Sequence, residues 1–353
     1  MKKVLVAGAG QIGSLLASLL ASVADYQVYL ADTKPIELTG PVVVKLDVMD
    51  SKKLIAFLQQ EQIGAVISCL PYYCNLAIAE LAKKQNLNYF DLTEDVTVGE
   101  AIKKLAAHYQ HAYVPHCGVA PGLVNIIAAS LIKKFDKLEK VELRVGNLPQ
   151  NISNALQYAL SWSTDGLINE YGNTCYGLIK GKKAELEPLE DLEEVIVDGA
   201  VYEAFNTSGG VGNMVELYEG KVDSLNYKTL RYPGHRDKIH FLMQDLKLNS
   251  QRDILKKILE NALPRVAQDV TLINISVKGW QNKQMVEETY LKKIYPKVLL
   301  GKEWCAIQVV TAISAATAVD LVLSSDHYQG YIYQENFELM AVKNNRFGKL
   351  LEL

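Results

Sequence analysis

Three glycines near the start of the chain have the spacing of a nucleotide-binding turn. They follow a short apolar segment and precede a stretch whose apolar residues repeat as in a helix. In such a turn Gly8 permits the sharp bend, Gly10 lets a pyrophosphate approach the backbone, and Gly13 lets the helix pack against the strand. We therefore predict that this turn binds the phosphates of a dinucleotide. Its members are Gly8, Gly10, Gln11, Ile12 and Gly13.

An acidic residue follows the turn at about the distance that is typical of dinucleotide-binding folds. This residue, Asp32, ends a second apolar segment. A carboxylate there accepts hydrogen bonds from the adenosine ribose and repels a 2′-phosphate, which favours NAD over NADP. Lys34 partly offsets that repulsion, and forming a turn before Pro35 is the alternative role for Asp32. Asp47, after the next apolar segment, is expected either near the adenine or as a helix cap.

Three later segments place polar, sulfur and aromatic side chains where predicted strands end. They are residues 68–75, 91–95 and 116–125. In a doubly wound sheet, ligands bind beyond the carboxyl ends of the strands, so these segments are candidates for cofactor and catalytic contacts. The residues assigned to the cofactor are Cys69, Leu70 and Pro71. The candidates for chemistry are Tyr72, Asp91, Asp95, His116 and Cys117.

The elements that must position these residues alternate between strand and helix. Strands that alternate with helices of ten or more residues indicate an α/β fold, a doubly wound parallel sheet of Rossmann type. The predicted strands are residues 3–7, 27–31, 41–46, 65–70, 89–92 and 112–115. The predicted helices are residues 11–24, 50–60, 75–85 and 98–108.

The middle of the chain follows a different pattern, which indicates an α+β domain of antiparallel strands with helices on one side. Its predicted strands are residues 138–145, 174–180, 201–206 and 224–232, followed by a hairpin of residues 270–280 and 284–295. Its predicted helices are residues 237–248 and 251–263. A long apolar helix is expected at residues 303–323.

The motifs, taken together and in order, resemble the saccharopine dehydrogenase family. Besides the glycine turn they are Leu70-Pro71-Tyr72, Tyr89-Phe90-Asp91, Gly118-x-x-Pro121-Gly122, Gly146-Asn147-Leu148-Pro149, Ser161-Trp162-Ser163, Thr207-Ser208-Gly209-Gly210 and Thr229-Leu230-Arg231-Tyr232-Pro233-Gly234-His235. Residues 162–171 and 231–235 are most similar to the lysine 6-dehydrogenase branch. The resemblance implies a substrate domain inserted into the Rossmann domain, so we expect domains of residues 1–122 plus 303–353 and of residues 123–302.

The resemblance also implies a reaction. Members of the family are pyridine-nucleotide oxidoreductases that act on the C–N bond of an amino acid. Hydride transfer to the nicotinamide leaves an imine, which hydrolyses to a semialdehyde, a reaction of lysine metabolism. The partner that the resemblance implies is then a small-molecule amino-acid substrate. A protein that binds or senses the nucleotide without catalysis is the alternative, because fold does not determine function.

An amino-acid substrate needs a cation opposite its carboxylate, and a guanidinium binds a carboxylate with two hydrogen bonds. Arg231, at a predicted strand end, is the candidate anchor; a surface arginine is the alternative. Trp162 is expected to contact the apolar stem of the substrate, unless it is a core residue. The substrate-binding candidates are Asp91, Asn154, Trp162, Thr207, Ser208 and Arg231.

Oxidation of an amine needs a group that accepts a proton near neutral pH. The candidates are Tyr72, His116 and Cys117, and Tyr72 matches the tyrosine of the Leu-Ile-Pro-Tyr turn in the family that the chain resembles. His116 and Cys117 replace the acidic residue that precedes Gly-x-x-Pro-Gly in relatives, which leaves the identity of the base open. His235, near Arg231, is a further candidate, with a buried hydrogen-bonded imidazole as its alternative.

Composition limits the remaining classes of protein. The 37 basic and 40 acidic residues give a net charge of −3, without the basic stripe that nucleic-acid binding needs. Five cysteines, an odd number, favour a reducing compartment, and we expect a cytoplasmic homodimer. The cysteine spacing does not fit a metal site. The uncharged run at residues 4–24 could be a secretory signal, but only a folded turn explains its glycines, so we expect no membrane association.

Overall fold

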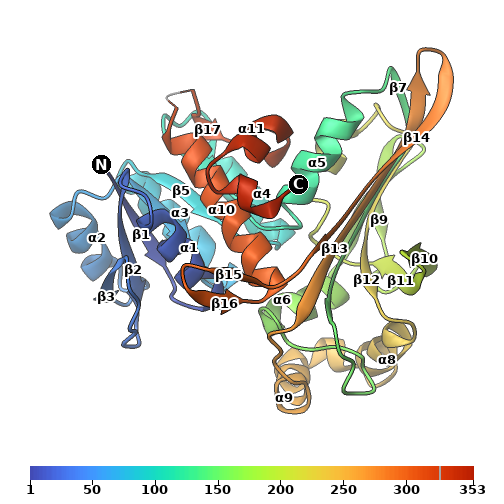
Figure 1. The fold of residues 1–353 in the computed structure, drawn as a ribbon, viewed down its shortest axis with the longest axis horizontal. Helices are drawn as coiled ribbons and strands as arrows, with labels where there is room; N and C mark the ends of the chain where they lie inside the picture. The colour runs from blue at the N-terminus through green and yellow to red at the C-terminus, as the bar shows by residue number, and fades with distance from the viewer. Residues whose placement is uncertain (326) are drawn as a thin grey trace. The chain divides into compact units, whose positions relative to one another are not determined.

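Six short apolar strands from the first third of the chain, with one strand from near its end, build a parallel sheet of seven strands (Figure 1). Their order is β17-β6-β5-β4-β1-β2-β3, and each neighbouring pair is parallel. The strand order changes direction between β1 and β4, which places a ligand crevice at their carboxyl ends. The strands are β1 Lys2–Ala7, β2 Tyr26–Asp32, β3 Val42–Lys45, β4 Ala65–Ser68, β5 Asn88–Asp91, β6 Ala112–Val114 and β17 Gly330–Tyr331.

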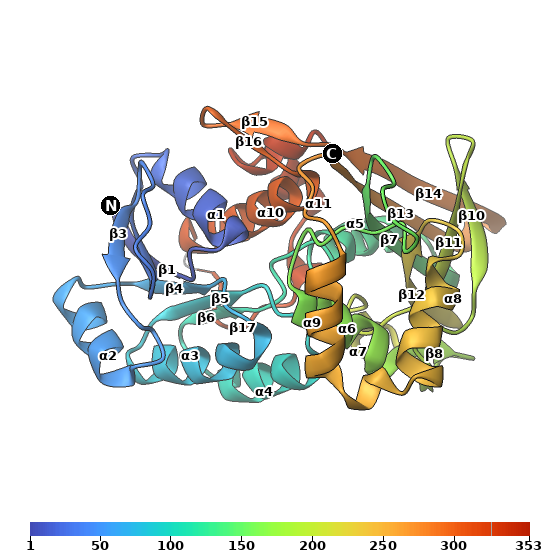
Figure 2. The same ribbon diagram turned by 90° about the horizontal axis from the view of Figure 1, so that it is seen from below.

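Helices cover both faces of this sheet, which confirms the predicted doubly wound fold. Figure 2 shows α2, α3 and α4 on one face and α1 and α10 on the other. Each helix turns its apolar stripe to the sheet; α2, for example, buries Leu54 and Leu58. The helices are α1 Gln11–Ala21, α2 Ser51–Gln60, α3 Tyr72–Lys84, α4 Val96–Ala106, α10 Ala306–Leu323 and α11 Leu339–Asn344.

The structure, a computed structural model, describes residues 1–325 and 327–353. These residues divide into two units, Met1–Leu123 with Gln308–Leu353, and Val124–Ile307. We call them unit 1 and unit 2. The predicted domain boundaries, at residues 122/123 and 302/303, lie close to these divisions.

The long apolar helix begins later in the chain than predicted. Residues 302–304 form a strand, β16 (Lys302–Trp304), which pairs with β15 (Lys297–Leu299). Leu300 and Gly301 between them both have positive φ, of 52° and 78°, as a tight hairpin turn requires. Helix α10 is long and apolar enough to cross a membrane, and 78% of that window is buried within the protein, as in a core helix.

Unit 2 is built on an eight-stranded mixed sheet in the order β10-β11-β12-β7-β13-β14, with β8 paired to β12 and β9 to β8. We predicted an antiparallel arrangement, but β7 and β12 are parallel. The chain between these two strands is long enough to cross over, so they can enter the sheet in the same direction. The strands are β7 Lys137–Pro149, β8 Cys175–Ile179, β9 Lys182–Leu186, β10 Glu193–Val197, β11 Ala200–Asn206, β12 Ser224–Arg231, β13 Asp269–Gln281 and β14 Gln284–Ile294.

The predicted hairpin is present as β13 and β14, with Asn282 and Lys283 at its turn. The helix predicted at residues 237–248 is shorter, because the regular α-helix α8 gives way after His240 to a wider turn at residues 241–245. Helices α6 and α9 pack together over a core that includes Leu167, Tyr171 and Leu255. The helices of unit 2 are α5 Leu123–Ile132, α6 Thr164–Gly172, α7 Met214–Tyr218, α8 His235–His240 and α9 Arg252–Ala262.

Asp320, on α10, holds the last residues of the chain to the sheet of unit 1. Its carboxylate accepts hydrogen bonds from Tyr26 Oη at 2.8 Å, Asn345 Nδ2 at 2.7 Å and Arg346 Nε at 3.1 Å. Burial by itself raises the pKa of Asp320, but the hydrogen bonds from Arg346 and Tyr26 outweigh it and the net shift is downward. Its stabilising contribution is therefore present above the pKa of the unfolded chain and is lost as the pH falls through the folded-state pKa.

We expect Asp320→Asn to lower the free energy of unfolding of the protein by about 1–3 kcal/mol at neutral pH, because buried donors lose a charged acceptor. Urea denaturation followed by circular dichroism measures the change. Asp25→Asn is the matched control, since Asp25 also pairs with Arg346 but its side chain is 59% exposed. Its effect should stay within about 0.5 kcal/mol. Equal losses in both variants would contradict the role assigned to Asp320.

Candidate functional site

The glycine turn has the geometry that phosphate binding needs. Gly8, directly after β1, has a φ of +97°, which a residue with a side chain rarely adopts. Gly10 precedes α1, and a Cβ placed there would meet no atom within 4 Å. A Cβ on Gly13 would lie only 2.0 Å from the carbonyl oxygen of Gly8. Thus Gly13 is needed for helix packing, while Gly10 faces open space that a ligand can enter.

The first turn of α1 offers free backbone donors to an anion. No side chain in the described part of the chain caps this helix, and its first turn holds no acidic residue. Uncapped N–H groups and the positive end of the helix dipole together bind phosphate. The residues present therefore fit the pyrophosphate of a dinucleotide.

Asp32 ends β2 and lies beside the glycine turn. Its Oδ2 accepts a hydrogen bond from the Ala9 backbone N–H at 2.9 Å, and its Oδ1 accepts one from the Lys34 N–H at 2.9 Å. Burial raises the pKa of Asp32, but these backbone hydrogen bonds outweigh it, so the pKa is lowered and the group is ionised at neutral pH. Its remaining lone pairs can accept hydrogen bonds from ribose hydroxyls.

Asp47 does not cap the next helix, so that interpretation is wrong. Its Oδ1 accepts from the Met49 N–H at 2.9 Å, whereas Asp50 caps α2 through the Lys53 N–H. An Asx turn of this kind fixes the loop after β3. The predicted contact of Asp47 with the adenine stays a prediction.

The loop after β4 lies against the glycine turn, as its assignment to the cofactor requires. The Cys69 N–H donates to the Ala7 carbonyl at 2.8 Å. A Cβ added to Gly8 would lie 3.0 Å from the Cys69 carbonyl oxygen. Pro71 then precedes α3, and Leu70 also borders the turn. Tyr72 is the half-buried first residue of α3, and its ring packs edge-on against Tyr73.

Asp91 has a different role from the substrate contact that we predicted. It is fully buried, and its carboxylate accepts from Tyr89 Oη at 2.8 Å, the Thr93 N–H at 2.9 Å and the His116 N–H at 3.2 Å. Burial raises the pKa of Asp91, and these donors oppose the rise. In this structure Asp91 is a positioning residue that joins the end of β5 to the loop after β6.

His116 is held in a single orientation inside unit 1. Its φ is +64°, and its Nδ1 lies 2.7 Å from the Thr93 carbonyl oxygen, so Nδ1 carries the proton and Nε2 keeps a lone pair. The ring lies close to Gly99 on α4, where an added Cβ would come within 2.9 Å of Nε2. The ring of His116 is therefore fixed, and Nε2 is the ring nitrogen that the hydrogen bond to Thr93 leaves unused.

Cys117 does not have the form expected of a catalytic cysteine. Its Sγ donates to the Val114 carbonyl at 3.1 Å, and burial raises the pKa of the thiol. A nucleophilic cysteine needs a lowered pKa and access to the substrate. We therefore correct the prediction: the thiol stays protonated in the interior of unit 1.

In unit 2, Arg231 is buried at the end of β12, with 3% of its residue surface exposed. Its Nε donates to Tyr171 Oη at 2.8 Å and its Nη1 to the Leu230 carbonyl at 2.9 Å. The guanidinium carbon lies 5.0 Å from the centre of the Tyr158 ring, a cation–π contact. Its Nη2 lies 3.6 Å from Glu170 Oε2, beyond a hydrogen bond. The surface-arginine alternative is therefore wrong.

His235 supports Arg231 and is not a base. Its Nδ1 lies 2.7 Å from the Leu156 carbonyl oxygen and its Nε2 lies 3.0 Å from Tyr171 Oη. Burial and the charge of Arg231 lower the pKa of His235 to about 3. The neutral ring donates from Nδ1 and accepts the Tyr171 proton at Nε2, so both nitrogens are occupied. This is the buried imidazole that was the alternative prediction, and the proposed base role is corrected.

Three other predicted substrate residues occupy supporting positions. Trp162 Nε1 donates to Tyr158 Oη at 3.1 Å, and Asn154 Nδ2 donates to the Tyr158 carbonyl at 2.7 Å. Both therefore fix the tyrosine that lies under the guanidinium. Ser208 Oγ donates to the Thr174 carbonyl at 2.9 Å. The hydroxyl of Thr207, in contrast, is buried without a hydrogen-bond partner.

Sequence reasoning missed the residues that surround Arg231 in space. Glu170 and Tyr171 lie inside the motif at residues 162–171, which carried the resemblance, but neither was assigned a role. Their proximity to β12 is a tertiary contact. The available signal was an acidic residue beside an aromatic one within that motif.

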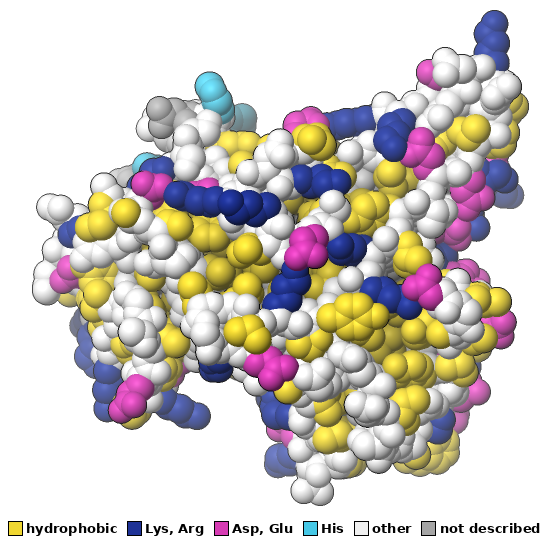
Figure 3. All heavy atoms as spheres, in the orientation of Figure 1, with side chains coloured by type: hydrophobic (Ala, Val, Ile, Leu, Met, Phe, Trp, Pro, Cys, Tyr) yellow, Lys and Arg dark blue, Asp and Glu magenta, His cyan; other side chains and the backbone are white. Residues whose placement is uncertain are grey.

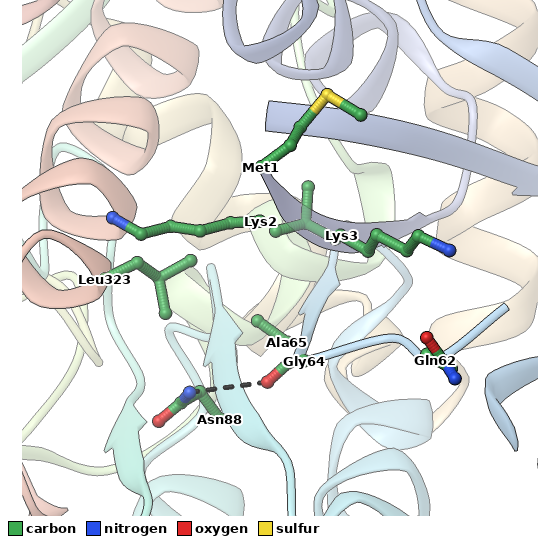
Figure 4. A pocket seen from close by; sticks show the side chains of 9 residues that line it. Met1, Lys2, Lys3, Gln62, Gly64, Ala65, Asn88 and Leu323 are labelled. Carbon is green, nitrogen blue, oxygen red and sulfur yellow. Dashed lines mark hydrogen bonds between the residues drawn. The ribbon is translucent and has the colours of Figure 1, made fainter. Parts of the chain in front are cut away.

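Other features of the surface do not add a site. A hollow of about 330 Å³ lies at the amino ends of β1, β4 and β5, where Asn88 donates to the Gly64 carbonyl (Figure 4). This is the end of the sheet away from the glycine turn. Basic and acidic side chains are interspersed on the face shown in Figure 3. Among the described residues, no group of three or more His, Cys, Asp or Glu could hold a metal ion.

The parallel sheet, the glycine turn and the acid that ends β2 define a dinucleotide-binding protein of Rossmann type. Residues 4–115 match the saccharopine dehydrogenase NADP binding domain, and residues 118–344 match the saccharopine dehydrogenase C-terminal domain. The chain therefore belongs to the saccharopine dehydrogenase family, and it is an oxidoreductase with a nicotinamide cofactor.

Solved structures show the same fold at low identity. Apo saccharopine dehydrogenase (L-Glu forming) from Saccharomyces cerevisiae is 16% identical with a TM-score of 0.77, over 98% of this chain and 97% of that one. Homospermidine synthase from Legionella pneumophila, in complex with NAD, is 12% identical with a TM-score of 0.69, over 99% of this chain and 89% of that one.

We expect Gly10→Val to abolish nucleotide binding and to leave the fold intact, because its side chain would occupy the phosphate space without meeting protein atoms. Titration of NADH fluorescence measures binding, and circular dichroism measures folding. Gly13→Val is the contrasting variant: it should unfold or destabilise unit 1, because its Cβ meets the Gly8 carbonyl. A folded Gly10→Val protein with unchanged affinity would refute the assignment of the turn.

Proposed function

We propose that this protein is an NAD-dependent amino-acid dehydrogenase that oxidises the carbon bearing an amine nitrogen, as a lysine 6-dehydrogenase does. The observation that carries the proposal is the buried guanidinium of Arg231 in unit 2. Its Nη2 makes no hydrogen bond to the described residues and so remains available to a substrate carboxylate. A buried cation of this kind suits an amino acid better than an uncharged substrate.

The proposed reaction balances as follows. The amine carbon loses a hydride and the nitrogen loses a proton, which forms a carbon–nitrogen double bond. A nicotinamide ring, when bound by the glycine turn and Asp32, supplies the hydride acceptor. Water then adds to the imine carbon and ammonia leaves, which gives a semialdehyde.

We assign the proton transfer to His116. The candidates Cys117 and His235 are occupied by internal hydrogen bonds, and the Asp91 carboxylate already accepts three. His116 keeps a lone pair on Nε2, and its ring is fixed by Thr93. In this proposal Nε2 takes the proton from the substrate nitrogen and later activates water.

The choice of NAD over NADP rests on Asp32. Its carboxylate is ionised and held at the end of β2, where a 2′-phosphate would meet a negative charge. The matching family domain is described as NADP binding. We propose that Asp32 gives this chain a preference for NAD instead.

We expect the wild-type protein to bind NAD more tightly than NADP. Asp32→Ala should weaken the binding of NAD and reduce the difference between the two affinities. The loss of two ribose hydrogen bonds to a charged acceptor is about 1.5–3 kcal/mol, or roughly tenfold to a hundredfold in affinity. Calorimetric titration with both nucleotides provides the test. Tighter binding of NADP by the wild type would overturn the proposal.

Arg231→Ala should lower kcat/KM for lysine by roughly tenfold to a hundredfold or more, because a charge-assisted contact is lost. NAD affinity should remain near that of the wild type, since the nucleotide residues lie in unit 1. Arg231→Lys should recover part of the activity, because an ammonium lacks the planar fork. NADH formation at about 340 nm is the measurement.

Cadaverine, which is lysine without the carboxylate, is the substrate control. Cadaverine should be a poor substrate for the wild type, and Arg231→Ala should lower its kcat/KM only slightly further. An equal loss with both substrates would make Arg231 purely structural. Nucleotide binding without NADH formation from lysine, saccharopine or other amino acids would instead favour the sensing protein, a role that the unusual His116-Cys117 pair leaves open.

A further inference from the structure

Glu170, the acidic neighbour of Arg231, is a buried carboxylate without its own hydrogen-bond donor. Its Oε2 has no partner among the described residues, and its side chain is 12% exposed. The nearest cation is Arg231 Nη2, at 3.6 Å. A buried carboxylate that lacks donors is unfavourable, so an unmet acceptor here points to a ligand that supplies them.

A second unmet polar atom lies in the chain segment next to Glu170. The Ser208 N–H donates to the Glu170 carbonyl at 2.9 Å, which ties the end of β11 to α6. Thr207, adjacent to Ser208, is 3% exposed, and its Oγ1 has no hydrogen-bond partner. Among the described residues, Glu170 and the segment bonded to its backbone thus each carry a buried oxygen without a hydrogen-bond partner.

The charges around Glu170 favour a positively charged ligand group. Among the described residues, Arg231 is the one full charge that acts on Glu170, and the other titratable groups that face Glu170 are neutral at physiological pH. Burial raises the pKa of Glu170 to about 7, against the opposing effect of Arg231. The facing groups are Tyr158, Tyr171, Cys175 and Tyr227, from the segment before α6, from α6, from β8 and from β12.

We propose that Glu170 binds the α-ammonium of the substrate while Arg231 binds its α-carboxylate, so that the pair selects α-amino acids. The inference rests on the proposed function and names its substrate class. The two charges of an amino acid are carried on one carbon, so their receptors must be neighbours of opposite sign, as Arg231 and Glu170 are. The amine to be oxidised is then a different nitrogen, farther along the side chain.

A role of Glu170 as ammonium receptor can be distinguished by experiment from a role as internal counter-ion of Arg231. A counter-ion affects every ligand of Arg231 alike, whereas an ammonium receptor affects only ligands that carry the α-ammonium. Three probes make this distinction: L-lysine; 6-aminohexanoate, which lacks only the α-ammonium; and cadaverine, which keeps both amines and lacks only the carboxylate. Saturating NADH prevents turnover, so calorimetry measures their binding alone.

The wild type should bind lysine at least tenfold more tightly than 6-aminohexanoate. Glu170→Gln, which keeps the size of the side chain, should lower the affinity for lysine by about tenfold to a hundredfold. Its affinity for 6-aminohexanoate should stay within about twofold of the wild-type value. Asp165→Asn is the control, because it removes a carboxylate from the same helix at a partly exposed pair with Lys256. It should bind all three ligands as the wild type does.

The pH dependence gives a second readout. Lysine affinity of the wild type should rise between pH 6 and 8, as Glu170 ionises, and that rise should vanish in Glu170→Gln. Equal weakening of lysine and 6-aminohexanoate, or no weakening of either, would overturn the role of Glu170. If lysine yields NADH in that case, the proposed dehydrogenase stands; if no amino acid binds or reacts, both proposals fall.

Discussion

A guanidinium ion buried inside a protein needs partners in every direction, and in unit 2 this requirement determines how several segments are arranged. Tyr171 on α6 accepts a hydrogen bond from Arg231 Nε and donates one to His235 Nε2 on α8. The Leu156 carbonyl accepts from the other side of His235, and Tyr158 lies under the guanidinium plane. An isolated buried charge would be strongly unfavourable, so each partner offsets part of its desolvation.

This network explains why a histidine beside an arginine is neutral. The positive charge of Arg231 and the loss of water both disfavour a second cation, so the imidazole can serve only as a hydrogen-bond link. Its tautomer is then set by the Leu156 carbonyl. The result is a rigid guanidinium whose orientation does not depend on a ligand, which lowers the entropy lost when a carboxylate binds.

Much of the fold follows from local sequence patterns, whereas much of the site does not. The spacing of Gly8, Gly10 and Gly13 and the alternation of strands and helices predict the Rossmann sheet, because both signals are short in range. The helix predicted from residue 303 begins at Ala306, because the turn at Leu300 and Gly301 lets residues 302–304 pair as a strand with β15. Glu170 was missed because burial and a missing partner are properties of packing, which no spacing reveals.

The same limit explains the candidates that changed role. Cys117 and His235 have residue types that do chemistry, but tertiary contacts and burial decide their protonation states. Asp91 ends a strand where ligands bind, yet the backbone of the next loop uses its carboxylate. Residue type and strand position thus locate the right region of the fold. The internal hydrogen bonds of each side chain then show which groups can still contact a ligand.

The path of the chain through unit 1 has a consequence for how the protein is made. Strand β17 pairs with β6, and the segment after residue 307 supplies most of α10 and the Asp320 contacts, yet all of unit 2 lies between. On the ribosome, the sheet of unit 1 must therefore wait with an unpaired edge at β6 while 184 residues of unit 2 (124 to 307) are synthesised. At the roughly 5–20 residues per second of translation, that interval lasts on the order of ten seconds or more. An exposed strand edge invites pairing with other chains, so this nascent protein should depend on chaperones more than one whose domains are contiguous in sequence.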